Sequence, residues 1–117
     1  MAPHHWPDHI KQQAERAMAD LESFYDKMRE CTPFGRRNEL HKLPSIRSAI
    51  ASVSGADGYV MGKLTALDGV CKELSSQRPP KGFDEQTTIV WGLGDVSNIR
   101  AQLENMGLLE HYSRPHQ

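Results

Sequence analysis

The 117-residue chain lacks long apolar runs and carries almost no net charge. No stretch approaches the ~20 consecutive apolar residues that a membrane-spanning helix needs, so we expect no membrane segment. Fourteen Lys and Arg residues oppose 15 Asp and Glu residues. This balance gives no electrostatic attraction to nucleic acid or to an anionic membrane surface. The N-terminus has no apolar signal-peptide core, so we expect a cytoplasmic protein.

The sequence also lacks the motifs that mark common enzymes and metal sites. It has no Cys-x-x-Cys and no His-Glu-x-x-His, and Gly92-Leu93-Gly94 lacks the third glycine of a nucleotide-binding loop. The histidines nearest the N-terminus are His4, His5 and His9. Pro7 interrupts their spacing, and an N-terminal arm does not hold metal ligands in fixed geometry. We therefore expect no enzyme, no cofactor and no metal site.

What the sequence does contain is helical periodicity, first in residues 7–31. Apolar residues recur there in steps of four and three, which predicts one amphipathic helix. These residues are Ile10, Ala14, Ala17, Leu21, Phe24, Met28 and Cys31. Pro7 and Asp8 suit its first turn, and residues 1–6 should form a flexible arm.

The same periodicity returns in residues 46–74. The apolar positions are Ile46, Ile50, Val53, Val60, Leu64, Leu67, Cys71 and Leu74. The phase survives the turn-like residues 54–58, so we predict one long helix over 45–75, kinked at 55–58. Ile50, Val53, Val60, Leu64 and Leu67 then form either a core or a dimer interface.

Small residues form a second stripe on this predicted helix, namely Ala51, Gly55, Gly58, Gly62, Ala66 and Gly69. Glycine inside a helix costs about 1 kcal/mol relative to alanine, so several glycines need a compensating gain. We favour close approach by another helix over a hinge.

The predicted helices are joined by a proline-interrupted connection. Thr32-Pro33 should end the first helix, and residues 34–37 should form a loop with Arg36 and Arg37 solvated. The two cysteines should be buried and unpaired. In an antiparallel hairpin, Cys71 would lie beside the start of the first helix, far from Cys31.

A smaller helical segment is predicted over residues 84–107. Asp84 is a good N-cap. Residues 87–91 favour strand by propensity, but no partner strand exists, so we predict helix. Gly92 and Gly94 should break this element, and Asp95 should cap a last helix that Gly107 ends. Leu108, Leu109 and Tyr112 should fold back on the core.

The expected fold is therefore all-α, a long two-helix hairpin with a smaller C-terminal helical segment, in a single domain over residues 1–117. Two long helices with narrow apolar stripes leave apolar surface that the short C-terminal part can hardly cover, so we also expect a homodimer.

The first helix carries a stripe wider than a two-helix contact needs, formed by Met18, Leu21, Tyr25 and Met28. One interpretation is a core-facing helix. The other is a surface for a protein partner, because Met and Tyr are common at such surfaces.

Residues 91–109 resemble the turn and recognition helix of winged helix-turn-helix regulators, which end in a similar Leu-x-x-Met-Gly-Leu-Leu phrase. Between residues 84 and 110, five acids oppose Arg100 alone, so a recognition helix would be repelled by phosphates. We retain DNA binding only as an alternative.

In its length, its long helices at 8–31 and 45–74 and its neutral charge, the chain resembles the QslA-like antiactivators of LasR, a LuxR-type quorum-sensing regulator. The resemblance implies transcription regulation by a protein–protein interaction, in which the inhibitor blocks dimerisation and DNA binding of the transcription factor. A phage-type inhibitor of a bacterial defence complex is a further alternative from sequence.

Overall fold

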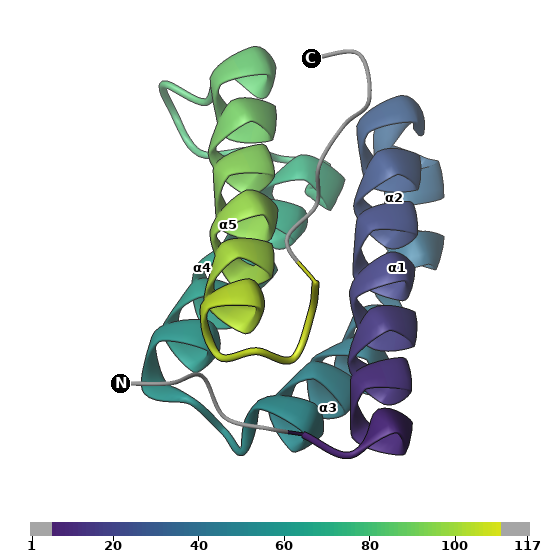
Figure 1. The fold of residues 1–117 in the computed structure, drawn as a ribbon. Coiled ribbons are helices and arrows are strands. Elements are labelled where there is room, and N and C mark those ends of the chain that lie inside the picture. Colours follow the sequence, from purple (N-terminus) through teal and green to yellow (C-terminus); the bar gives the residue numbers. More distant parts are fainter. Residues whose placement is uncertain (1–5, 111–117) are drawn as a thin grey trace, which may run out of the picture.

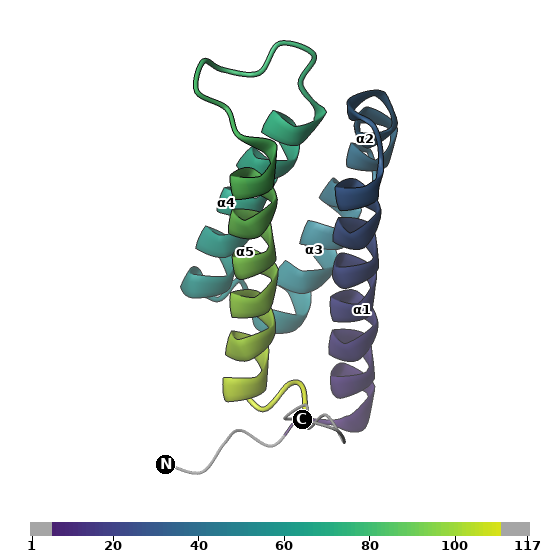
Figure 2. The ribbon, with the colours of Figure 1, turned by 90° about the horizontal axis from the view of Figure 1, so that it is seen from above.

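The computed structural model describes residues 6–110, which contain five helices and no strand (Figure 1). The helices are α1 (Asp8–Glu30), α2 (Pro33–Leu40), α3 (Leu43–Ser54), α4 (Gly58–Ser75) and α5 (Glu85–Asn105). The all-α prediction is confirmed. The arrangement is not a long two-helix hairpin. Helix α1 packs mainly on α3, and α4 and α5 lie side by side in both views (Figures 1 and 2). Helix α5 also contacts α1.

The helix predicted over 45–75 is wrong as a single element, because the chain reverses between α3 and α4. Gly55 adopts a left-handed conformation with φ of 64°, and the Ala56 N–H donates to the Ala51 carbonyl, which closes a Schellman-type C-cap. The Asp57 side chain then caps α4 by accepting from the Val60 N–H at 3.1 Å. Local capping therefore ends the helix, although the apolar phase continues across the break.

Residues 34–37 form part of a helix rather than the predicted loop. The Thr32 hydroxyl accepts from the Gly35 N–H at 3.1 Å, and Pro33 occupies the first turn, where its missing N–H is harmless. The same proline that ends α1 thus starts α2.

Arg36, predicted to be solvated, is instead buried with 3% of its surface exposed. Its Nε donates to the Met28 carbonyl at 2.6 Å, and its Nη2 donates to the Arg29 carbonyl at 3.3 Å. Its Nη1 donates to the Leu74 carbonyl at 3.2 Å and to the Glu85 carboxylate at 2.9 Å. One guanidinium therefore joins the C-terminal ends of α1 and α4 to the first residue of α5.

The C-terminal segment is helical as predicted, but α5 runs unbroken through Gly92 and Gly94, and Asp95 lies inside it. Asp84 caps α5 as expected, with its carboxylate accepting from the Thr87 N–H at 2.8 Å. Gly92 is where two helices approach closely, since a Cβ there would overlap the Tyr25 ring of α1. The Tyr25 hydroxyl donates to the Ile89 carbonyl at 2.8 Å beside it.

Close approach by another helix was predicted at the glycines of the small-residue stripe in residues 51–69. Within this chain that prediction is wrong. At Gly55, Gly58, Gly62 and Gly69, an added Cβ would have no heavy atom within 4 Å. These glycines give no close helix–helix contact inside the chain.

The two ends of the described chain meet at one end of the fold. The Trp6 indole donates to the Met106 carbonyl at 2.8 Å and packs against the core, so the flexible arm predicted for 1–6 is wrong at this residue. Residues 1–5 lie outside the described part. Gly107, with φ of 82°, follows α5, and Leu108 and Leu109 are buried as predicted. Tyr112 lies outside the described residues.

Gly92→Ala tests the contact that positions α5 on α1. Alanine normally stabilises a helix by up to about 1 kcal/mol over glycine, but here it must displace the Tyr25 ring, an overpacking cost of about 1–3 kcal/mol. We expect Gly92→Ala to lower the free energy of unfolding in urea titrations. Gly94→Ala, two residues along with open space, should not lower it. Equal effects of the two substitutions would contradict this packing.

Arg36→Ala should strongly destabilise the fold. It leaves the Met28 and Leu74 carbonyls without their donor, and each buried acceptor left unsatisfied costs about 1–3 kcal/mol. Arg37→Ala is the matched control, because Arg37 is exposed and such changes stay within about 0.5 kcal/mol. Similar unfolding midpoints for the two variants would exclude a structural role for the Arg36 hydrogen bonds.

Candidate protein-binding surface

The four residues predicted to bind a partner are in the core instead. Met18, Leu21 and Met28 are 0% exposed and Tyr25 is 1% exposed. The stripe is wide because α1 packs against α2, α3 and α5, so apolar residues are needed over much of its circumference. As a docking surface on the folded chain, this prediction is wrong.

The five apolar residues predicted to form either a core or a dimer interface are in the core. Ile50, Val60, Leu64 and Leu67 are 0% exposed, and Val53 is 8% exposed. They join the α1 residues in one apolar cluster. The break between α3 and α4 lets both halves of the stripe face that cluster.

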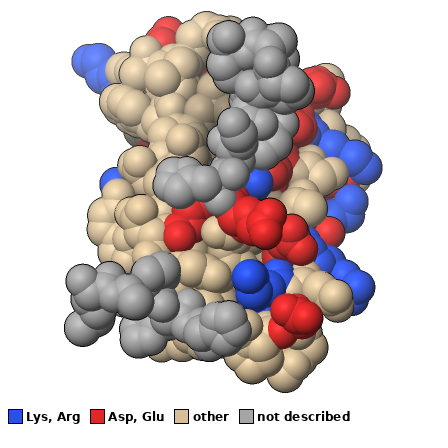
Figure 3. All heavy atoms as spheres, in the orientation of Figure 1, with Lys and Arg blue, Asp and Glu red and all other residues tan. Residues whose placement is uncertain are grey.

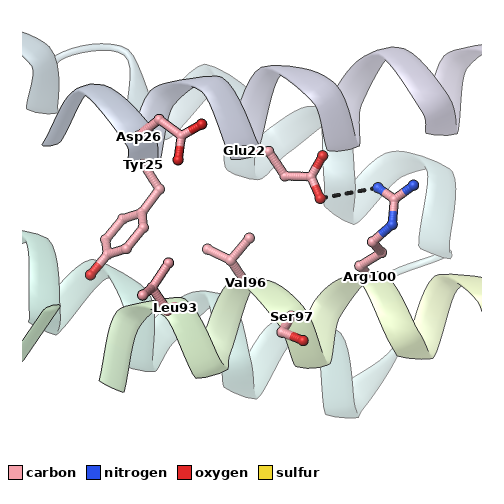
Figure 4. Close-up of a pocket in the computed structure, with 7 residues that line it drawn as sticks. All are labelled: Glu22, Tyr25, Asp26, Leu93, Val96, Ser97 and Arg100. Atoms are coloured by element: carbon pink, nitrogen blue, oxygen red, sulfur yellow. Dashed lines mark hydrogen bonds and ion pairs between the residues drawn. The ribbon is translucent and has the colours of Figure 1, made fainter. Parts of the chain in front are cut away.

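Among the hollows of the described surface, an open groove of about 580 Å³ lies between α1 and α5 (Figure 4). From α1 it is lined by Glu22, Tyr25 and Asp26, and from α5 by Leu93, Val96, Ser97 and Arg100. Leu93 is 37% exposed at its edge. The groove follows from the Tyr25–Gly92 contact, which brings the two helices together just beside it.

The charged groups of the groove are already paired in part. Arg100 donates to the Glu22 carboxylate at 3.1 Å and also pairs with Glu104 at 3.4 Å, so two acids share one base (Figure 4). Asp26 pairs only with the exposed Arg29, at 3.4 Å. Because the lining holds the two carboxylates of Glu22 and Asp26 and the one guanidinium of Arg100, the groove has an excess of negative charge.

The proposed recognition helix for DNA does not have the required geometry. The residues compared with its turn, Gly92 and Gly94, lie inside α5, so no turn precedes a separate helix. Arg100 is engaged with Glu22 and Glu104. Neither observation favours the DNA-binding alternative.

The fully exposed residues of α5 from 86 onward are uncharged and partly apolar, and they extend beyond the groove. Val90 and Trp91 are each 60% exposed. The exposed residues from 86 to 105 are Gln86, Thr87, Val90, Trp91, Leu93, Gly94, Ser97, Ala101 and Asn105. Figure 3 shows few charged atoms on the side where α4 and α5 lie, whereas red and blue atoms gather over α1 and its border with α5. Sequence reasoning missed this face because it placed a helix end at Gly92.

The buried nucleophiles are not activated. Burial raises the pKa of the Cys71 thiol to about 12, with Asp68 and Asp95 adding to the effect. Burial also raises the pKa of Tyr25, and the neighbouring Cys71 contributes. This proximity shows that Cys71 lies beside the later part of α1 rather than its start, which corrects the hairpin argument. Cys31 and Cys71 are both unpaired.

Residues 6–110 contain neither a cluster of metal-binding side chains nor a membrane-spanning helix. No group of three or more His, Cys, Asp or Glu side chains there is arranged to bind a metal ion. None of the five helices combines the length and apolar character needed to cross a bilayer. His4 and His5 lie outside this range.

Comparison with known proteins identifies no relative: no protein-family model, curated protein or solved structure matches the chain.

Thiol labelling tests the environment of the two cysteines. A thiol with a pKa near 12 is protonated at pH 8, so the thiolate of Cys71 is scarce and also shielded. In single-cysteine variants (Cys31→Ser and Cys71→Ala), Ellman's reagent should label Cys31 at least roughly 100-fold faster than Cys71. Urea should remove the difference. Comparable rates in the folded variants would show that Cys71 is accessible.

Proposed function

We propose that the protein acts without catalysis, by binding a segment of a partner protein in the α1–α5 groove. The observation that carries the proposal is the groove itself, in which the half-exposed Leu93 and the largely buried Val96 of α5 lie on the wall opposite the Glu22 and Asp26 carboxylates of α1. An exposed apolar side chain bordering a cleft is a common anchor point for protein recognition.

The chemistry of the groove defines the partner segment. Leu93 and Val96 favour an apolar side chain, while Glu22 and Asp26 on the α1 wall favour a neighbouring Lys or Arg. Because Glu22 shares Arg100 with Glu104, a basic side chain from the partner would find acceptor capacity left there. A short segment with an apolar residue next to a basic one fits both requirements.

The more specific proposal is an antiactivator that binds a LuxR-type transcription factor and prevents its dimerisation. Its support is the resemblance in chain length, charge and the long first helix, which α1 retains. The second long helix of that resemblance is divided into α3 and α4. The groove supports protein binding in general, and the choice of partner rests on the resemblance.

Leu93→Asp tests the groove. It replaces the apolar side chain at the edge of the groove with a carboxylate, which an apolar side chain of the partner would have to desolvate, while an exposed position on α5 should tolerate it in the folded chain. We expect binding to a purified LasR-type ligand-binding domain to weaken by at least about 2 kcal/mol, or roughly 30-fold, in calorimetry.

Phe34→Asp provides the control, because Phe34 is also a large exposed apolar residue, 69% exposed, but lies on α2. It should leave partner binding unchanged. If Phe34→Asp weakened binding and Leu93→Asp did not, the groove would not be the binding site. If the wild-type protein bound no such domain, the antiactivator proposal would fail and the groove would require another partner.

A further inference from the structure

We propose that a second copy of this chain packs on the outer face of α4 and α5, a surface distinct from the groove. We define this outer face by its exposed residues. On α4 these are Tyr59, Gly62, Thr65, Ala66 and Gly69, and on α5 they are Val90, Trp91, Gly94 and Ala101. The inference does not depend on the proposed function.

The first argument is the low charge on a face of two neighbouring helices. The fully exposed residues of α4 from 58 to 69 and of α5 from 86 to 105 include no Lys, Arg, Asp or Glu. Lys63, Asp68 and Asp95 are partly buried and of mixed sign, and the Lys63 Nζ lies 5.5 Å from the centroid of the Tyr59 ring. On α1, by contrast, Glu15, Arg16, Asp20 and Lys27 are all exposed. A two-fold interface brings a surface against itself, so a strongly charged patch would meet like charge, whereas a face with few charges of mixed sign is self-compatible.

The second argument comes from large apolar side chains near both ends of this face. Trp91 and Val90 are each 60% exposed, and Tyr59 is 49% exposed. Aromatic residues with this exposure are the usual anchors of protein interfaces. They give the outer face a favourable free energy of burial that an uncharged surface of small residues alone would lack.

The third argument is that the helical glycines on this face make no close helix–helix contact within the chain. Gly62, Gly69 and Gly94 lie within helices, where each costs about 1 kcal/mol relative to alanine. A Cβ at any of them would have no heavy atom within 4 Å, whereas at Gly92 the missing Cβ makes room for Tyr25. A helix from a second copy could approach the backbone closely at these three positions.

The size of the face also favours a second copy that uses both helices. A stable interface buries about 800 Å² on each partner. One helix, about 10 Å wide and 25–30 Å long, offers roughly a third of that, so only two neighbouring helices together, with roughly two thirds, approach it. Because α4 and α5 pack side by side, two copies would bring four helices together at one interface.

Two substitutions disrupt this face without disturbing the fold. Trp91→Glu replaces an exposed apolar side chain with a charge, and Gly62→Arg places a long side chain where close approach is proposed. Both positions are exposed, and nothing lies within 4 Å of a Cβ at Gly62, so the isolated chain should accept the arginine. Removing glycine should even stabilise α4 slightly.

Sedimentation equilibrium of the wild-type chain should give a dimer mass at micromolar concentration. Trp91→Glu and Gly62→Arg should each raise the dimer dissociation constant by at least roughly tenfold, with unchanged helical circular dichroism. Phe34→Glu, on α2, should remain dimeric, as should the groove variant Leu93→Asp. A monomeric wild type up to about 100 μM would overturn the proposal, since stable interfaces of this size hold well below that concentration. A dimer that neither substitution weakens would place the interface elsewhere and would also overturn it.

Discussion

The buried Arg36 guanidinium is the interaction on which the arrangement of the helices depends. A charge out of water is tolerated only when its donors are satisfied, and Arg36 finds the carbonyls of Met28, Arg29 and Leu74 together with Glu85. The carbonyls at a helix C-terminus lack partners and carry partial negative charge. Arg36 meets such carbonyls from α1 and α4 at once. The ends of α1 and α4 and the start of α5 therefore have one mutual placement that satisfies it.

The Tyr25–Gly92 contact fixes the position of α5 along α1. Glycine is required where the tyrosine ring meets the helix backbone, and the hydroxyl completes the contact by donating to Ile89. Leu93 follows Gly92 directly, so it projects at the edge of the groove, and Val96 lies one turn further. The groove is thus a consequence of core packing, and its residues need no special conformation of their own.

Periodicity alone predicted much of this fold, and its failures have physical reasons. The apolar residues of α1, α3 and α4 were identified because a core face repeats every 3.6 residues. The break at Gly55 was missed because capping at Asp57 preserves that phase. Met18 and Tyr25 could be interpreted as a partner-binding surface because a helix that contacts three other helices has the same wide apolar stripe as a helix that binds a partner. The role of Arg36 has no local sequence signal, since three of its acceptors are backbone carbonyls, which any residue provides, and Leu74 and Glu85 are distant in the sequence.

The two proposed surfaces share α5, and this has a mechanical consequence. Glu85 is held by Arg36 at the start of the helix, and the Met106 carbonyl is held by Trp6 at its end. With both ends fixed, Leu93 in the groove and Trp91 on the outer face keep a constant relation. A dimer built on the outer face would carry two grooves in fixed geometry. A partner that is itself dimeric could then occupy both, and the second contact would form at a high effective concentration, so modest affinity at each groove would suffice.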